Sequence, residues 1–135
     1  MAREGKPLNE TVLIVDDHPS FRAMARLALE ADGFVVVGTA VDGASAVAEV
    51  LRLRPDIVLL DVGLPDMTGF EVASRLREAA SPAAIVLASS REKSDFGTLV
   101  ADSGARGLIE KSLLSGEEVR ALVTGSQPRD ILARP

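Results

Sequence analysis

Five short runs of aliphatic residues, none of which alternates apolar with polar positions, limit the possible folds of this chain most strongly. The runs are V-L-I-V at 12–15, V-V-V at 35–37, I-V-L-L at 57–60, I-V-L-A at 85–88 and G-L-I at 107–109. A strand with one face in water alternates, whereas a strand covered on both faces reads as continuous apolar sequence. The runs therefore predict strands of a parallel sheet that has helices on both faces.

Apolar residues with helical spacing occupy the segments between and after these runs. The stripes expected to face the sheet are Phe21, Met24, Ala25 and Ala28; Val47, Val50 and Leu51; Val72, Leu76, Ala79 and Ala80; Phe96, Leu99 and Val100; and Val119, Leu122 and Val123. Pro19 suits the first turn of the first helix, and Ser115 with Glu118 has the spacing of a capping box. Gly97 interrupts the fourth stretch and weakens it as a helix. Five strand–helix units in succession indicate an α/β fold with a doubly wound parallel sheet.

The length of the chain sets the number of domains. With 135 residues, 47% of them hydrophobic, the chain suits one domain with one ordinary core. Residues 11–124 contain all the predicted strands and helices. Residues 1–10 and 125–135 fit no element, so we expect flexible tails at both ends.

The composition excludes several classes of function. The net charge of -5 argues against direct binding of nucleic acid, which requires a positive surface. No apolar run approaches the roughly 18 residues of a membrane helix, and the polar N-terminal sequence lacks the core of a signal peptide. We therefore expect a cytoplasmic protein with no membrane contact. The absence of cysteine excludes disulfides, thiolate metal sites and cysteine nucleophiles.

Polar residues follow four of the predicted strands. The residues at these strand ends are Asp16 and Asp17, Asp61, Ser89, and Glu110 and Lys111. In open parallel sheets the ligand crevice lies outside the carboxyl ends of the strands, so these side chains should converge. Clustered carboxylates repel one another unless a cation lies among them, and oxygen ligands of this kind suit Mg²⁺. A lysine and a serine can bind phosphate oxygens, and a carboxylate beside a metal can accept a phosphoryl group.

Four motifs in the expected order resemble the receiver domain of response regulators in two-component signalling, over about residues 10–124. They are V-L-I-V-D-D at 12–17, L-L-D-V-G-L-P-D-M-T-G-F-E-V at 59–72, L-A-S-S at 87–90 and G-A-R-G-L-I-E-K at 104–111. D-D-H-P at 16–19 resembles the branch that often carries a helix-turn-helix output domain, although we expect no output domain after about residue 124. The resemblance implies a flavodoxin-like (βα)5 fold with strand order 2-1-3-4-5.

The resemblance also implies a function and a role for each site residue. The chain would be a phosphorylation switch, receiving its phosphoryl group from a sensor histidine kinase or a phosphotransfer protein and contacting a downstream protein through helix four, strand five and helix five. It would catalyse only its own Mg²⁺-dependent phosphorylation and dephosphorylation. The implied roles are Asp61 as phosphoacceptor; Asp17, Asp61 and the carbonyl of Gly63 as Mg²⁺ ligands; Asp16 acting largely through metal-bound water; and Lys111 and Ser89 contacting the phosphoryl group.

Two positions depart from the family pattern. Leu108 stands where the family usually has an aromatic switch residue, so the usual rotation of a ring is in doubt. Ser112 follows Lys111 where the family often has a proline in a cis peptide bond, which puts the geometry of the lysine loop in doubt. These departures motivate an alternative hypothesis, a degenerate receiver that binds a partner without phosphorylation.

Other interpretations fit the residues less well. A phosphatase of the haloacid dehalogenase type needs a second Asp two residues after the nucleophile, and position 63 is Gly. A flavodoxin-like flavin carrier would have hydroxyl groups, not two carboxylates, after the first strand. We favour Ser89 over Ser90 as the phosphoryl contact. We interpret His18 as a polar residue of the first helical turn, and expect the phosphohistidine on the partner.

Overall fold

The computed structural model describes residues 10–125, and in this range strands and helices alternate as predicted. The strands are β1 (Thr11–Val15), β2 (Val35–Ala40), β3 (Ile57–Asp61), β4 (Ala84–Ser89) and β5 (Gly107–Glu110). The helices are α1 (Pro19–Ala31), α2 (Gly43–Leu53), α3 (Gly69–Glu78), α4 (Leu99–Asp102) and α5 (Gly116–Thr124). Two short 3-10 turns, η2 (Lys93–Phe96) and η3 (Lys111–Leu113), precede α4 and α5.

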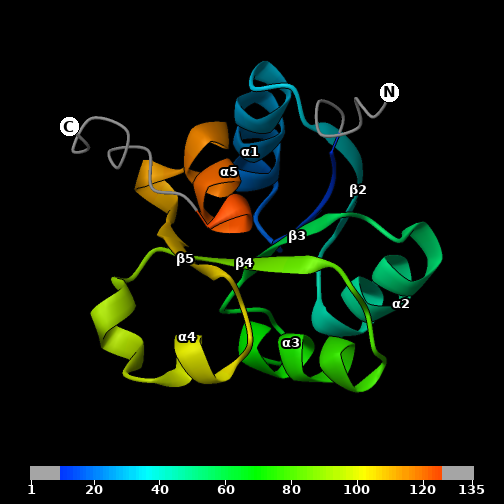
Figure 1. Cartoon of the computed structure of the whole chain (residues 1–135), viewed down its shortest axis with the longest axis vertical. Coiled ribbons are helices and arrows are strands. Elements are labelled where there is room, and N and C mark those ends of the chain that lie inside the picture. Colours follow the sequence, from blue (N-terminus) through cyan, green and yellow to red (C-terminus); the bar gives the residue numbers. More distant parts are fainter. Residues whose placement is uncertain (1–9, 126–135) are drawn as a thin grey trace.

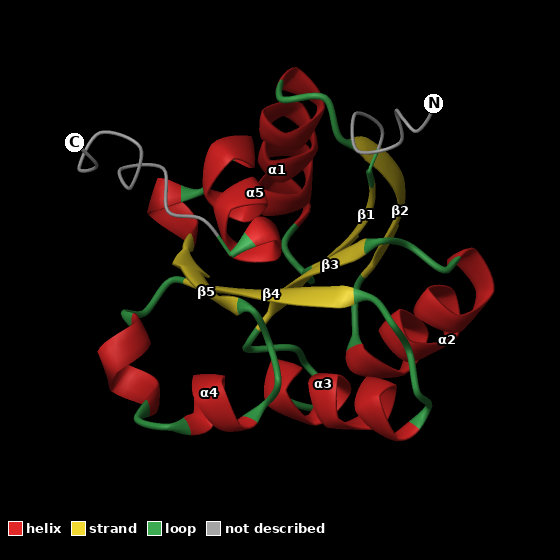
Figure 2. Cartoon of the chain, viewed as in Figure 1, coloured by secondary structure: helices red, strands yellow, loops and turns green. Residues whose placement is uncertain are grey.

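The five strands form one parallel sheet in the order β2-β1-β3-β4-β5. Helices α1 and α5 cover one face of the sheet, and α2, α3 and α4 cover the other (Figures 1 and 2). This arrangement confirms the flavodoxin-like (βα)5 fold and its strand order. It also brings the carboxyl ends of β1, β3, β4 and β5 to the same edge of the sheet.

The core consists of one apolar cluster on each face of the sheet. Every residue of β3 and β4 is buried, as are the last four of β1, because helices cover both sides of these central strands. Edge strands β2 and β5 are only partly buried. The continuous apolar runs therefore correctly indicated that the central strands are covered by helices on both faces. The edge strands have the same apolar composition but are less buried.

The predicted helical stripes are correct in part. The buried face of α1 is Phe21, Ala25 and Leu29, which follow one another at four-residue spacing, whereas Met24 is 40% exposed. Ala28 is only half-buried. Four residues advance a helix by slightly more than one turn, so this stripe drifts along α1 and leaves Met24 at its margin.

In α2 and α3 the buried residues also differ in part from the predicted stripes. Val50 is buried as expected, but Leu51 is 48% exposed. Val72 and Leu76 are buried, whereas α3 ends before Ala79 and Ala80, which are both exposed. The predicted stripe extended too far because alanine favours a helix, whereas Ala80 here adopts a left-handed φ of 58° at a position where glycine is usual.

The fourth helical stretch is broken at Gly97, where we expected a single weak helix. Gly97 has φ +57°, and this left-handed backbone separates η2 from the four-residue α4. Within α4, Val100 is buried, whereas Leu99 is exposed. In α5, Ser115 Oγ accepts a hydrogen bond from the Glu118 N–H, as the cap predicts.

The predicted tails fall almost entirely outside the described residues. Of residues 1–10 only Glu10 is described, and its carbonyl accepts a hydrogen bond from the Val35 N–H. Of residues 125–135 only Gly125 is described, as the C-cap of α5. Among the described residues, no helix is both long and apolar enough to span a bilayer.

Candidate functional site

The side chains at the carboxyl ends of neighbouring strands meet in one cluster. Asp16 directly follows β1, Asp61 ends β3 and Lys111 follows β5. The Lys111 Nζ lies 2.6 Å from Asp16 Oδ2 and 3.4 Å from Asp61 Oδ1. The sheet order thus brings together three residues that are far apart in the sequence, as the strand ends predicted.

Asp61 is buried at the centre of this cluster. Its Oδ1 accepts a hydrogen bond from the Gly63 N–H at 3.3 Å. Burial raises the pKa of the Asp61 carboxyl group and the charge of Asp16 raises it further, while Lys111 and the Gly63 N–H act in the opposite direction. The carboxylate form of Asp61 is therefore destabilised in the resting protein, and an added cation would stabilise it.

Asp16 is fully buried and held from several sides. Its Oδ1 accepts a hydrogen bond from the His18 N–H at 2.8 Å, and His18 Nδ1 lies 2.9 Å from the same oxygen. The Asp16 carbonyl accepts a hydrogen bond from the guanidinium of Arg22. The orientation of this carboxylate is consequently fixed by the turn between β1 and α1.

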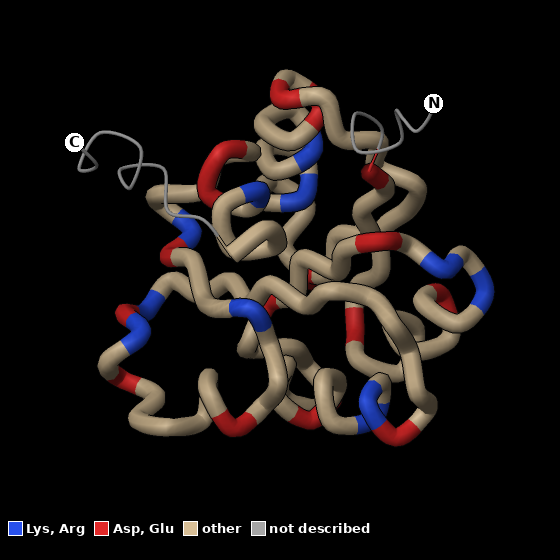
Figure 3. The backbone as a smooth tube through the Cα atoms, in the orientation of Figure 1, with Lys and Arg blue, Asp and Glu red and all other residues tan. Residues whose placement is uncertain are grey.

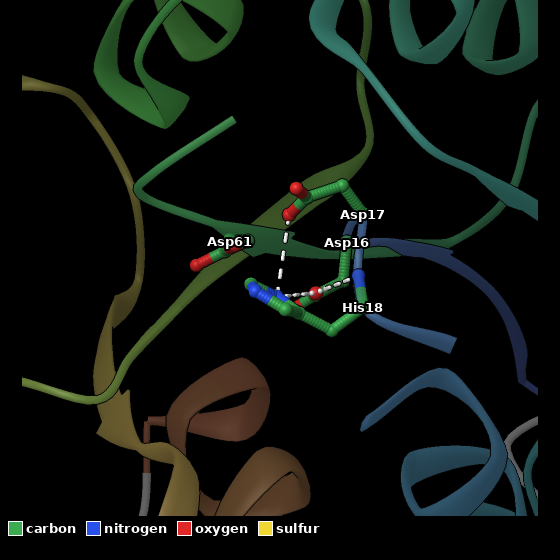
Figure 4. Close-up of side chains that lie close together, drawn as sticks. All are labelled: Asp16, Asp17, His18 and Asp61. Atoms are coloured by element: carbon green, nitrogen blue, oxygen red, sulfur yellow. Dashed lines mark hydrogen bonds and ion pairs between the residues drawn. The ribbon is translucent and has the colours of Figure 1, made fainter. Parts of the chain in front are cut away.

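Structural geometry brings His18 into the cluster, which the sequence alone did not indicate. Asp16, Asp17, His18 and Asp61 each offer a ligand atom, and these atoms lie within 4.8 Å of one another (Figure 4). His18 Nδ1 is 3.3 Å from Asp17 Oδ1. His18 is the N-cap of α1 and has an extended backbone, and its ring lies among the carboxylates of the cluster (Figure 4).

The donor atoms suit a hard divalent cation. Asp16 Oδ2 and Asp17 Oδ1 are buried, and no described residue donates a hydrogen bond to either, although Lys111 Nζ lies 2.6 Å from the former and His18 Nδ1 lies 3.3 Å from the latter. Three carboxylates against one ammonium leave an excess of negative charge. Carboxylate oxygens with unused lone pairs are the ligands that Mg²⁺ prefers, so the residues present fit this ion.

Ser89 lies beside Asp61 and is buried, whereas Ser90 is exposed. The Ser89 Oγ accepts a hydrogen bond from the Arg91 N–H at 3.0 Å. A cavity of about 230 Å³ opens above Asp61, and it is lined by His18, Asp61, Val62, Gly63, Ser89, Ser90, Arg91, Phe96 and Lys111. Burial and position favour Ser89 over Ser90 as the hydroxyl that faces a group on Asp61.

The loop after Asp61 is fixed by residues that the sequence analysis did not single out. Asp66 accepts hydrogen bonds from the N–H groups of Gly43 and Ala44, at 2.7 and 3.0 Å, and so ties this loop to the start of α2. These backbone hydrogen bonds lower the pKa of Asp66, that of Gly43 most. A Cβ at Gly69 would lie 2.5 Å from the Asp61 carbonyl oxygen, so only glycine lets α3 start this close to β3.

The structure shows how Leu108 and Ser112, the two residues that depart from the family pattern, are accommodated. Leu108 is half-buried on the α4 side of the sheet and packs against the apolar cluster that contains Val100. No cis peptide bond occurs among the described residues, so Lys111–Ser112 is trans. The Lys111 side chain still reaches Asp16 and Asp61 from the η3 turn.

A larger cavity of about 520 Å³ lies at the opposite, amino-terminal edge of the strands. Apolar and small residues near the ends of α2 and α3 line much of it, including Val50, Leu51 and Ala80. Ligands of open parallel sheets bind at the carboxyl edge, and the clustered carboxylates and lysine also lie there. We therefore take the smaller cavity above Asp61 as the candidate site.

Comparison with known proteins agrees with this geometry. Residues 12–124 match the model of the response regulator receiver domain. The chain belongs to this family of two-component signalling proteins. A receiver domain of the putative response regulator NarL from Mycobacterium tuberculosis superposes with a TM-score of 0.78 at 32% identity, covering 90% of this chain and 98% of that one.

Further relatives extend the comparison. A CheX–CheY–BeF3–Mg²⁺ complex from Borrelia burgdorferi contains a chain with a TM-score of 0.76 and 29% identity, covering 86% of this chain and 87% of that one. A putative transcriptional regulator of Pseudomonas aeruginosa is 37% identical over 100 residues, which are 74% of this chain and 48% of that protein. The chain thus spans about half the length of this relative.

Proposed function

We propose that this chain is a phosphorylation switch in which Asp61 accepts a phosphoryl group from the phosphohistidine of a sensor kinase or phosphotransfer protein. The observation that carries the proposal is the buried carboxylate of Asp61, 3.4 Å from the Lys111 ammonium and at the base of an open cavity. A buried carboxylate with a cation beside it is a suitable nucleophile for a dianionic phosphoryl group.

In the proposed step, a carboxylate oxygen of Asp61 bonds to phosphorus while the bond from phosphorus to the histidine nitrogen breaks. The electron pair of the broken bond stays on the imidazole of the donor. Lys111 balances charge on the phosphoryl oxygens, and the Ser89 hydroxyl donates a hydrogen bond to one of them. No redox partner or further reactant is required.

Mg²⁺ would be held by Asp17, Asp61 and the Gly63 carbonyl, with Asp16 acting largely through water. The ion would supply positive charge that lets the carboxylates and the phosphoryl group lie together. Asp17 Oδ1, a buried carboxylate oxygen that receives no hydrogen bond from the described residues, supports this assignment.

The proposed switch starts at Ser89. Its hydroxyl accepts the Arg91 N–H in the resting state, and we infer that the hydroxyl turns toward the phosphoryl group to donate its own proton to one of the oxygens. This movement would carry the signal to the face formed by α4, β5 and α5, where a downstream protein would bind. Catalysis would be limited to the chain's own phosphorylation and dephosphorylation.

We further propose that the chain acts in the cytoplasm through protein contacts, with neither DNA nor membrane as a direct partner. The net charge of -5 argues against DNA as a partner. Figure 3 shows basic and acidic residues interspersed along the described chain instead of separated onto opposite sides. Tight, salt-sensitive binding of the chain to duplex DNA would contradict this part of the proposal.

Intact-mass measurement after incubation with a small-molecule phosphodonor tests the proposed function. We expect one added phosphoryl group in the presence of Mg²⁺, none in excess chelator, and none in Asp61→Asn. Asp17→Ala should require far more Mg²⁺, whereas Ser90→Ala should be labelled normally. Full labelling in excess chelator would contradict the role of the metal. A wild-type chain that is never labelled but still binds a partner would favour the degenerate receiver instead.

A further inference from the structure

An aromatic ring lies directly beneath the ammonium of Lys111. The Lys111 Nζ is 4.6 Å from the ring centroid of Phe21, inside the range of about 6 Å over which a cation is attracted to the face of a ring. Phe21 belongs to the first turn of α1 and is 9% exposed. The Lys111 side chain is 17% exposed, so water screens this contact only in part.

Within the part of the chain that the structure describes, three charged or aromatic groups therefore surround the ammonium: the carboxylates of Asp16 and Asp61, and the ring of Phe21. Both carboxylates change their electrostatic role in the proposed reaction, since one helps to bind a cation and the other becomes phosphorylated. The ring is neutral and changes in neither event. It is the one group of the three that can keep the same contact with the ammonium throughout.

We propose that Phe21 is a positioning residue for phosphoryl transfer, whose ring face holds the Lys111 ammonium beside Asp61 through a cation–π contact. The ring face, unlike a carboxylate oxygen that accepts a hydrogen bond, does not require any one N–H of the ammonium to point at it. The ammonium can therefore turn from Asp16 to the phosphoryl oxygens without leaving the site. This inference rests on the proposed function, because it assumes that Lys111 meets the phosphoryl group.

A purely structural role for Phe21 would make a different prediction. The residue packs in the same apolar cluster as Ala25 and Leu29, so an aliphatic side chain could fill most of its volume. An aliphatic group, however, presents no negative face to the ammonium. Packing alone predicts an effect on stability, whereas a cation–π contact predicts an effect that depends on the electron density of the ring.

The chain provides a matched control for this distinction. Phe34 lies in the same apolar cluster, and the guanidinium carbon of Arg120 lies 4.3 Å from its ring centroid. Phe34 precedes β2, at the amino-terminal edge of the strands, away from Asp61. The same substitutions at Phe34 should thus change stability without changing phosphoryl transfer.

The deciding experiment replaces Phe21 with mono-, di- and trifluorinated phenylalanine, which progressively removes electron density from the ring face with little change in volume. The initial rate of phosphorylation by a small-molecule phosphodonor with Mg²⁺ is measured by intact mass. We expect the rate to fall stepwise, by about three- to tenfold at the trifluorinated ring. The same series at Phe34 should leave the rate unchanged. Equal rates across the Phe21 series, or an equal decline in the Phe34 series, would overturn the inference.

A spectroscopic readout separates this inference from the proposed function. The sequence contains three lysines, Lys6, Lys93 and Lys111, so lysine-selective labelling gives a simple NMR spectrum. The ring current of Phe21 should shift the ε-methylene signal of Lys111 upfield, and Phe21→Leu should abolish this shift while Phe34→Leu preserves it. An ordinary shift in the wild type would overturn the contact itself. Absence of phosphorylation in a wild type with the upfield signal would instead contradict the proposed function.

Discussion

The ammonium of Lys111 lies 2.6 Å from Oδ2 of Asp16, a carboxylate that is completely buried. In the resting chain, the cation expected to meet the phosphoryl group is therefore paired with a residue of the proposed metal site. The Lys111 ammonium and Mg²⁺ are both attracted to the carboxylates of this cluster. Each one partly neutralises the carboxylates and so weakens the attraction that the other experiences. Binding of metal and release of the lysine should consequently be coupled.

Removing this competing charge should strengthen metal binding and weaken catalysis. We expect Lys111→Met to bind Mg²⁺ about tenfold more tightly in calorimetric titration, since an ammonium beside the carboxylates no longer opposes the ion. Phosphorylation should slow by at least about tenfold because the phosphoryl charge loses its partner. Lys93→Met, an exposed lysine outside the Asp61 cavity, is the control. Unchanged or weaker Mg²⁺ binding by Lys111→Met would contradict the competition.

Asp61 should reduce the stability of the metal-free protein. Its pKa is raised mainly by burial, so ionisation of this carboxyl group disfavours the folded state. We expect Asp61→Asn to increase the free energy of unfolding by about 1 kcal/mol at neutral pH, measured in urea without divalent cations.

The pH dependence of this stabilisation has a definite sign. A raised folded pKa means that the wild type loses stability as pH rises through the window between the unfolded and folded pKa values of Asp61. The advantage of Asp61→Asn should therefore be full above the folded value and vanish below the unfolded value of about 3.9. An Asn variant that is less stable at neutral pH would show that Asp61 is not held at an electrostatic cost.

Asp66 should have the opposite pH dependence. Hydrogen bonds from Gly43 and Ala44 lower its pKa, so its stabilising effect is present above the unfolded pKa and is lost as pH falls through the folded one. We expect Asp66→Ala to lower the melting temperature by a few degrees at pH 7 and by less in acid. Exposed Glu78, changed to Gln, serves as the control. Equal melting temperatures at pH 7 would show that the Asp66 contacts do not hold the loop.

The fold was largely predictable because the same residues that form the strands also form the core. Burial of β1, β3 and β4 on both faces requires aliphatic side chains at nearly every position, with polar Asp61 and Ser89 only at the ends of β3 and β4, and this pattern is directly visible in the sequence. Helix faces were less predictable. Met24 and Leu51 are apolar yet exposed, and only the packing of α1 and α2 against the sheet decides which side of a broad stripe is buried.

The candidate site was predictable where a residue ends a strand, and it was missed where a loop folds back. Asp16, Asp61 and Lys111 could be grouped because parallel strands end at one edge. The ring of His18 and the carboxylate of Asp66 reach their partners through turn geometry, which residue spacing does not specify. The sequence predicted that Phe21 faces the core. It did not predict the contact between its ring and the Lys111 ammonium, because the two residues are ninety positions apart.

Leu108 should weaken the coupling between Asp61 and helix α4. Leucine is smaller than the family's usual aromatic residue and packs on the α4 side without a polar tip, so it can remain there in either state. On addition of a beryllofluoride phosphate mimic, we expect the amide shifts to change most near Asp61, Ser89 and Lys111, and less in α4.

The matched variant for this prediction is Leu108→Tyr, which should increase the response of α4 to the mimic. Gly97→Ala tests whether the backbone break before α4, and not residue 108, determines the response of α4. Gly97 has a left-handed φ of +57° that alanine disfavours. If α4 reorganises as a unit in the wild type and Leu108→Tyr leaves that response unaltered, residue 108 does not limit the coupling.

The most direct test of the central claim is to locate the phosphoryl group itself. The chain is phosphorylated with Mg²⁺, the acyl phosphate is reduced with borohydride, and peptides are mapped by mass spectrometry. Reduction converts an aspartyl phosphate into homoserine, so the account predicts homoserine at position 61 and unmodified Asp16, Asp17, Ser89 and Ser90. Homoserine at Asp16 or Asp17, or a borohydride-resistant phosphate on Ser89 or Ser90, would contradict it.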